Sequence, residues 1–145
     1  MRASTAVVTY TDRHFDGVKA LWQEMFPDDP PWNGADVAIP AKKAVQPELF
    51  LVAVDNGQVI GSVMAGYDGH RGWLYAVAVL NSHQRQGVGT ALIREAEKRL
   101  RSLGCGKINL QIRASNSAVV QFYKHLGYTA EDRVSMGKRV SPSAT

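Results

Sequence analysis

The first half of the chain alternates between short apolar runs and turn residues, which is the pattern of consecutive β-strands. Strands are predicted over residues 6–10, 49–55, 58–67 and 73–79. Asn56-Gly57 separates the second run from the third and is a strong signal for a two-residue hairpin. The turn over residues 68–72 separates the third run from the fourth. Three antiparallel strands therefore lead up to the glycine-rich stretch that begins near Gln84.

Apolar residues recur at helical spacing between and after these strands. Helices are predicted over residues 13–26, 40–45, 90–103 and 116–126, the second with Pro40 in its first turn. Further strands are predicted over residues 107–112, 128–132 and 134–140, where they would complete the sheet. This mixture of strands and helices indicates an α/β (α+β) fold.

Length and composition indicate one globular domain. The 145 residues are 45% hydrophobic, so we assign a single domain to residues 1–140 and expect a flexible tail over residues 141–145. No apolar run approaches the ~20 residues that a membrane-spanning helix needs, and the N-terminus lacks a signal-peptide pattern. We therefore expect a cytoplasmic protein, which the single Cys105 fits.

Charge is distributed unevenly along the chain. Residues 1–83 contain six Lys and Arg against nine Asp and Glu, a net charge of −3, whereas residues 84–145 contain eleven against four, a net charge of +7. A basic half suits either a nucleic acid or a phosphorylated cofactor. Because no run of Lys and Arg and no interleaved aromatic set marks a nucleic-acid surface, the cofactor is favoured.

The glycine-rich stretch SHQRQGVGTAL over residues 82–92 lies between a predicted strand and a predicted helix. A dinucleotide-binding loop needs Gly-x-Gly-x-x-Gly, but Leu92 stands where the third glycine belongs. Gly106-Lys107 lacks the rest of a Walker A loop, and the chain has no Gly-x-Ser-x-Gly nucleophile elbow. The four histidines and Cys105 show no metal-ligand spacing, so no metal is expected.

What remains in this stretch is Gln84-x-x-Gly87-x-Gly89. It resembles the acetyl-CoA-binding signature Q/R-x-x-G-x-G/A of the GNAT acetyltransferase superfamily. Glycines at these positions let backbone N–H groups approach a pyrophosphate, and the positive end of the following helix dipole adds to the attraction.

A second motif strengthens the resemblance. The positions Asn116, Phe122, Tyr123, Gly127 and Tyr128 match the superfamily's C-terminal signature N-x-x-A-x-x-[LF]-Y-x-x-x-G-[FY], with valine at the alanine position. The resemblance extends over residues 6–140. Three further stretches resemble a small bacterial subgroup without an assigned acetyl acceptor: residues 21–22, 31–33, and 66–72 together with 137–139. The chain is less closely similar to peptide N-terminal and aminoglycoside acetyltransferases.

The resemblance implies the GNAT fold: a central, mixed, mostly antiparallel twisted sheet of six to seven strands, splayed between the fourth and fifth and flanked by about four helices. Acetyl-CoA, the acetyl donor, would lie in the splay. The implied cofactor-binding positions are Val77, Ala78, Val79, Gln84, Arg85, Gln86, Gly87, Val88, Gly89, Thr90, Asn116, Tyr123 and Lys124. An N–H at Val77 or Ala78 would polarise the thioester carbonyl, and Lys124 would meet the 3′-phosphate.

The implied reaction is direct acetyl transfer to a primary amine, through a ternary complex and a tetrahedral intermediate. Tyr123 is the expected proton donor to the CoA thiolate, because the reference pKa of a phenol, ~10, is close enough to that of a thiol; simple packing beside Phe122 is the alternative. Asp68 and His70 are the candidates for the general base. The alternative for Asp68 is that it only forms a hairpin turn, and a water chain could also serve.

The acidic first half predicts that the acceptor is a cationic amine of a small molecule or a peptide. No nucleic acid or membrane partner is expected, and the sequence leaves a homodimer open. The alternative hypothesis for the whole chain is that it is a sensor, which binds acetyl-CoA without transferring its acetyl group. The presence of Tyr123 argues against a sensor, which has no use for a proton donor.

Overall fold

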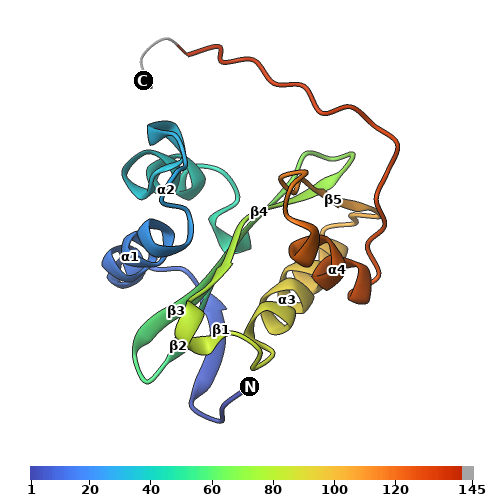
Figure 1. Ribbon diagram of the computed structural model, residues 1–145. Coiled ribbons are helices and arrows are strands. Elements are labelled where there is room, and N and C mark those ends of the chain that lie inside the picture. Colours follow the sequence, from blue (N-terminus) through green and yellow to red (C-terminus); the bar gives the residue numbers. More distant parts are fainter. Residues whose placement is uncertain (142–145) are drawn as a thin grey trace. The chain divides into compact units, whose positions relative to one another are not determined.

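The computed structural model describes residues 1–141 (Figure 1). The chain falls into two compact units, Met1–Leu110 and the residues from Gln111 on. Of the predicted tail over residues 141–145, only Ser141 is among the described residues. No helix in the described part is both long enough and apolar enough to cross a bilayer.

The first unit is built on one mixed sheet. Its strands are β1 (Thr5–Thr9), β2 (Phe50–Asp55), β3 (Gln58–Tyr67), β4 (Gly72–Val79) and β5 (Ile108–Leu110). They lie in the order β1-β2-β3-β4-β5, and every pair is antiparallel except β4 and β5, which are parallel. The prediction of a mixed, mostly antiparallel sheet is confirmed.

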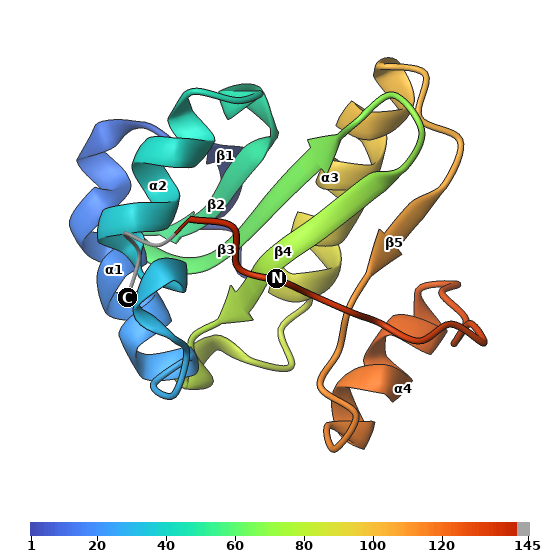
Figure 2. The same cartoon turned by 90° about the horizontal axis from the view of Figure 1, so that it is seen from above.

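Four α-helices are present among the described residues. They are α1 (Phe15–Met25), α2 (Ala35–Lys43), α3 (Val88–Ser102) and α4 (Ser117–His125). Short 3-10 turns, η1 (Asp12–His14), η2 (Pro31–Asn33), η3 (Pro47–Leu49) and η4 (Asn81–His83), join some of the elements. In the first unit, α1 and α2 lie on one face of the sheet and α3 lies on the other (Figure 2). The helix α4 belongs to the second unit.

The sheet is buried on both faces because helices cover both. Phe50 and Val52 of β2 join the cluster formed with α1 and α2, and the alternate residues Leu51 and Ala53 are equally buried. On α3 the buried residues recur at helical spacing: Val88, Leu92, Ile93, Ala96, Glu97 and Leu100. The strand β2 therefore reads as a continuous apolar run rather than as an alternating one.

The predicted second helix needs correction. The helix predicted over residues 40–45 spans Ala35–Lys43, so Pro40 lies within it rather than in its first turn. Pro40 is exposed, where the loss of one backbone hydrogen bond is tolerated in a short helix.

The sheet has five strands rather than the predicted six to seven. Among residues 1–141, neither residues 128–132 nor 134–140 form a strand. Val134, Met136 and Val140 are 89%, 91% and 88% exposed, so their apolar alternation is not buried against a core. A period-two pattern yields a strand only where a neighbouring edge bonds its N–H and C=O groups, and these residues join no ladder.

Candidate active site

The strand β4 changes its bonding partners along its length. Its first three residues pair with β5, matching Gly72 to Ile108, Trp73 to Asn109 and Leu74 to Leu110. Beyond Leu74, no residue of β4 pairs with β5 in the described chain. The backbone groups on that edge of residues 75–79 are therefore not bonded to β5, and they form an edge to which an extended ligand can bind.

A β-bulge lies in this unpaired part of β4. Ser62 of β3 faces Ala78 and Met64 faces Tyr75, so three steps along β4 match two along β3. Ala76, inside the extra step, has a φ of +50°, which is left-handed and uncommon for a residue with a Cβ. Bulges of this kind turn backbone groups out of the regular ladder direction.

Two buried side chains hold the bulge from the α1 side. The Ser62 hydroxyl donates a hydrogen bond of 2.7 Å to the carbonyl oxygen of Ala76 and accepts one of 2.9 Å from Nε1 of Trp22. Ser62 is fully buried, and Trp22 is nearly so. Neither residue is predicted from the sequence to take part in this contact, and a serine within the apolar run of β3 is the one signal that could have suggested it.

The glycine loop ends at an uncapped helix N-terminus. Gly87 is the N-cap residue of α3, with a φ of +81°, and no side chain caps this end of the helix. Arg85 is also left-handed, with a φ of +63°. Left-handed residues alternating with others turn successive N–H groups toward one side, which makes an anion-binding concavity in front of the helix dipole.

Gln84 ties the loop to the end of β4. Its Nε2 donates hydrogen bonds of 3.1 Å to the carbonyl oxygen of Val79 and 3.2 Å to Oδ1 of Asn81. The glutamine of the first motif therefore has a structural use, because it fixes where the loop begins.

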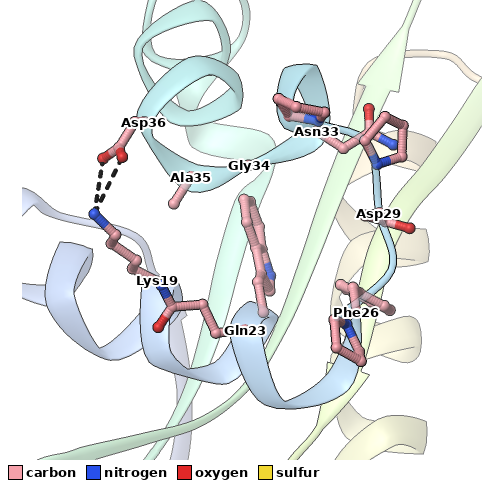
Figure 3. Close-up of a pocket in the computed structure, with 12 residues that line it drawn as sticks. Lys19, Gln23, Phe26, Asp29, Asn33, Gly34, Ala35 and Asp36 are labelled. Atoms are coloured by element: carbon pink, nitrogen blue, oxygen red, sulfur yellow. Dashed lines mark hydrogen bonds and ion pairs between the residues drawn. The ribbon is translucent and has the colours of Figure 1, made fainter.

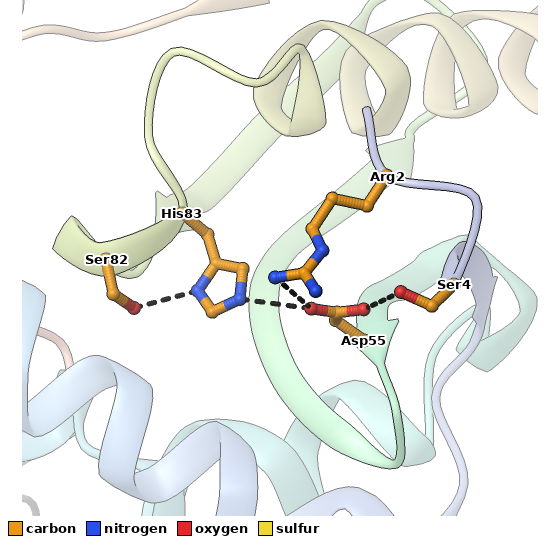
Figure 4. Close-up of polar contacts among 5 residues, drawn as sticks. All are labelled: Arg2, Ser4, Asp55, Ser82 and His83. Carbon is orange, nitrogen blue, oxygen red and sulfur yellow. Dashed lines mark hydrogen bonds and ion pairs between the residues drawn. The ribbon is translucent and has the colours of Figure 1, made fainter.

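A buried carboxylate anchors the other side of the loop (Figure 4). Asp55, at the end of β2, accepts hydrogen bonds from Ser4 and His83 and lies 3.7 Å from Nη1 of Arg2. The Ser4 hydroxyl, together with His83 and Arg2, lowers the pKa of Asp55. The other ring nitrogen of His83 lies 2.8 Å from the Ser82 hydroxyl. Since His83 directly precedes Gln84, this cluster positions the start of the glycine loop.

A pocket of about 320 Å³ lies between α1 and α2 (Figure 3). Its lining residues are Lys19, Trp22, Gln23, Phe26, Pro27, Asp29, Pro30, Pro31, Asn33, Gly34, Ala35 and Asp36. Lys19 and Asp36 form an ion pair of 3.1 Å across it. Asp29 gives the lining a second carboxylate, so the acidic side chains outnumber the basic ones.

The turn between β3 and β4 contains the two candidate bases. Oδ1 of Asp68 accepts hydrogen bonds of 2.7 Å from the backbone N–H groups of both His70 and Arg71. These two bonds, Arg71 first, lower the pKa of Asp68. A carboxylate engaged in this way is a weak base and an effective turn former.

The distance along β4 also separates this turn from the bulge. Gly72 begins β4, and five extended steps to Val77 cover ~16 Å. Because Asp68 and His70 lie before Gly72, their roles as bases remain predictions that would require a relay to the bulge.

The second unit contains the remaining predicted site residues on or beside α4. Oδ1 of Asn116 accepts a hydrogen bond of 3.3 Å from the N–H of Val119, which makes Asn116 the N-cap of α4. The Tyr123 ring meets Phe122 and Tyr128 edge to face, at centroid distances of 5.1 and 5.6 Å. Burial raises the pKa of Tyr123 to about 12, so its hydroxyl remains protonated at neutral pH. Lys124 is exposed.

The structure thus brings the predicted residues together in three groups. Residues 77–79 and 84–90 lie on the stretch of chain that runs from the end of β4 through η4 and the glycine loop into α3. Asn116, Tyr123 and Lys124 share the region of α4. The candidate bases Asp68 and His70 share the β3–β4 turn. Among residues 1–141, no three His, Cys, Asp or Glu side chains lie together in a way that could hold a metal ion.

Known proteins place this arrangement in a family. Residues 15–128 match the acetyltransferase (GNAT) family. An N-acetyltransferase of Yersinia pestis is 44% identical over 110 residues, which cover 76% of this chain and 78% of that protein. The chain therefore belongs to the GNAT acetyltransferase family, and the predicted enzyme class, an N-acetyltransferase, is confirmed.

Solved structures agree on the fold. Ard1 from Thermoplasma volcanium superposes with a TM-score of 0.79 at 21% identity, over 88% of this chain and 84% of its own. An aminoglycoside N-acetyltransferase in complex with CoA superposes with a TM-score of 0.76 at 18% identity, over 94% and 95%. At these identities the likeness establishes the fold, and the acceptor has to be inferred from this chain's own residues.

Proposed function

We propose that the enzyme transfers the acetyl group of acetyl-CoA directly to a cationic primary amine. The observation that carries this proposal is the path of β4, which leaves β5 after Leu74, bulges at Ala76 and continues through the glycine loop into an uncapped helix. One continuous segment thus offers an open backbone edge, a reoriented peptide unit and an anion-binding helix terminus. An elongated ligand with amide groups in its middle and a phosphate group at one end fits that order.

The residues present suit acetyl-CoA in chemical terms. The open edge over residues 77–79 would bond the pantetheine amides, and the N–H groups of residues 85–90 would hold the pyrophosphate. Gly87 leaves room there, because it has no side chain and its left-handed backbone suits no other residue well. Lys124, which is exposed, is the cation that the family resemblance proposes for a further phosphate. The complex of the aminoglycoside N-acetyltransferase with CoA is consistent with this assignment.

The transfer is balanced without a protein nucleophile. The amine first gives one proton to a base or to water, because only the neutral nitrogen can attack the thioester carbonyl carbon. The carbon–sulfur bond then breaks, and the nitrogen loses a second proton as the amide forms. The departing thiolate gains one proton, for which Tyr123 is the proposed donor. The products are an acetamide and CoA with a free thiol.

The pocket between α1 and α2 is the proposed acceptor site. Its lining contains Asp29 and Asp36 against one cation, Lys19, which is already paired with Asp36. An acidic pocket concentrates cationic amines and disfavours carboxylate-rich acceptors. This supports a small cationic amine or a peptide N-terminus as the acceptor class.

Two measurements test the proposal. Acetyl-CoA should raise the Tm of the wild-type protein, because it binds only the folded state, whereas NAD and ATP should raise it much less. Gly89→Val, which puts a branched side chain where the pyrophosphate would approach, should abolish that shift and leave the unliganded Tm nearly unchanged. Normal binding by Gly89→Val would overturn the loop assignment.

A screen of amines, polyamines, aminoglycosides and peptide N-termini for CoA release would then identify the acceptor. Tight acetyl-CoA binding without release of CoA for any amine would favour the sensor over the enzyme. Preference for an acceptor rich in carboxylates would contradict the acidic pocket as its site.

A further inference from the structure

Ser62 and Trp22 are buried polar groups that the proposed reaction does not use directly. Ser62 is the polar member of an otherwise apolar stretch of β3, and both its hydrogen bonds are internal. A buried hydroxyl is tolerated when it is bonded, but an apolar residue of similar size would fill the same space without needing a partner. Because Ser62 is nevertheless polar, its two hydrogen bonds should hold a specific part of the backbone in place.

The group held in place is the peptide unit that joins Ala76 to Val77. The described chain contains no cis peptide bond, and in a planar trans unit the carbonyl oxygen of one residue and the N–H of the next point in opposite directions. The Ala76 oxygen is bound 2.7 Å from Ser62 Oγ, on β3. The N–H of Val77 is therefore directed away from Ser62 and β3, and the edge of β4 that β5 has left lies on that side.

The backbone alone would not secure this orientation. Ala76 is left-handed, which is unfavourable for a residue with a Cβ, so the regular ladder would relieve that strain by turning the peptide unit back. A specific contact has to outweigh the strain, and the hydrogen bond from Ser62 is the one in place. Trp22 in turn fixes the Ser62 hydroxyl, since its indole N–H occupies the acceptor side of that oxygen and leaves its proton for Ala76.

We infer that Ser62, oriented by Trp22, is a positioning residue that aims the N–H of Val77 at the thioester carbonyl of acetyl-CoA. The inference rests on the proposed function, and it selects Val77 over Ala78 as the donor to the oxyanion. Because Trp22 also lines the pocket between α1 and α2, one indole ring connects the proposed acceptor site to the donor that activates the thioester.

The test reads the carbonyl group directly and needs no acceptor amine. The infrared stretching frequency of acetyl-CoA labelled with ¹³C at the carbonyl falls when a hydrogen bond polarises that group. We expect wild-type protein to lower the frequency, and Ser62→Ala to lose most of this shift while the dissociation constant of acetyl-CoA changes by less than about threefold. In a separate assay with an amine from the screen, the kcat of Ser62→Ala should fall by roughly 10–100-fold, since a misdirected oxyanion donor loses part of its full effect.

Matched variants separate positioning from stability. Val52 is fully buried and lies directly opposite Ser62 across β2 and β3, so Val52→Ala perturbs the same part of the core without removing a hydrogen bond to β4. It should lower the Tm and keep the frequency shift. Ser62→Thr, which restores the hydroxyl, should recover the shift at least in part.

If Ser62→Ala does not fold, Trp22→Phe carries the test, because it keeps an aromatic ring and removes the indole N–H, together with part of the ring volume that Val52→Ala controls for. It should lose a smaller part of the shift than Ser62→Ala is expected to lose. A wild-type frequency shift in Ser62→Ala or in Trp22→Phe would overturn the inference, as would an equal loss in Val52→Ala. Failure of the wild-type protein to bind acetyl-CoA would overturn the proposed function itself, and that outcome is distinguishable because it appears before any substitution is made.

Discussion

The two ends of β4 show how one strand can serve both stability and chemistry. At its first end, residues 72–74 are paired on both sides, to β3 and to β5. Gly72 is packed so closely there that an added Cβ would lie 2.8 Å from Sγ of Cys105. At its other end, residues 75–79 pair only with β3, and Ala76 takes a left-handed conformation.

The difference lies in what fixes the backbone. Ladder hydrogen bonds and tight packing fix the paired end, and they leave no group available for a ligand. At the bulged end, the Ser62 side chain replaces part of the ladder, so a peptide unit can face outward without being mobile.

The largest effect should come from Tyr123→Phe, which keeps the ring and removes the proposed proton donor. We expect kcat to fall by ~10–1,000-fold with little change in acetyl-CoA affinity, the range for loss of a general acid. Tyr128→Phe is the matched control, since it removes a hydroxyl from the ring that meets Tyr123 edge to face. Steady-state kinetics with an amine from the screen would measure both. Equal kcat values for the wild type and Tyr123→Phe would reduce Tyr123 to a packing residue.

A substitution at the paired end should lower the stability of the folded protein. Gly72→Ala should lower the free energy of unfolding by ~1–3 kcal/mol, as expected for overpacking, because the new methyl group meets Cys105 and Leu100. Gly106→Ala, whose Cβ would meet nothing within 4 Å, should be neutral or slightly stabilising. Urea titrations would compare the two. Recovery of stability in the double variant Gly72→Ala/Cys105→Ala would identify the clashing sulfur.

A substitution of Ala76 at the bulged end should change stability through the backbone conformation that the new residue prefers, rather than through steric clashes. Ala76→Val should destabilise the protein by ~1–2 kcal/mol, because a β-branched residue is poorly suited to a left-handed conformation. Ala76→Gly should be neutral or stabilising at the same position. Thermal unfolding of both variants would decide it, and a glycine variant less stable than the wild type would argue against the left-handed bulge.

A smaller effect concerns alkaline pH. Burial raises the pKa of Tyr123 to about 12, whereas an unfolded tyrosine ionises near ~10. Between these values the unfolded chain releases a proton that the folded chain keeps, so the free energy of unfolding falls as the pH rises above ~10. Tyr123→Phe should show a shallower decline from pH 9 to 11 than the wild type. Tyr10 and Tyr75, whose pKa values burial also raises, account for the decline that remains.

The smallest effect is expected at the β3–β4 turn. His70→Gln should change kcat/KM by less than about threefold, because His70 lies before Gly72 and an extended strand from Gly72 to Val77 spans ~16 Å. Asp68→Asn should mainly weaken the turn, since its carboxylate accepts two backbone hydrogen bonds. A pH–rate profile that loses its acidic limb in His70→Gln would instead assign the base to this turn.

Local patterns predicted much of the fold. The Asn56-Gly57 signal yields a hairpin in which both residues have positive φ, and the apolar spacing after the glycine loop yields α3 within two residues of its predicted start. The spacing of Gln84, Gly87 and Gly89 excludes other phosphate loops, and together with the second motif it predicts a cofactor loop, which stays a prediction. In these cases a few neighbouring residues determine the structure.

Features that depend on distant partners were not predicted. The run over residues 73–79 reads as a uniform strand, and nothing within it marks the bulge at Ala76. The contact between Trp22 and Ser62 joins residues 40 positions apart, which no periodicity reveals. The strands predicted over residues 128–140 failed for the same reason, since alternation specifies which side chains could be buried but not whether an edge is present to pair with them.

The strand order of the sheet also has a kinetic consequence. From β1 to β5, spatial order follows chain order, and the hairpins that join β2, β3 and β4 close loops of only a few residues. The pairings of β1 with β2 and of β4 with β5 are different, because the first must wait for α1 and α2 and the second for the whole of α3. Contacts over short chain separations form first, as loop closure costs less entropy. We therefore expect the meander to form early in refolding, and the point at which β4 and β5 diverge to be among the last features to appear.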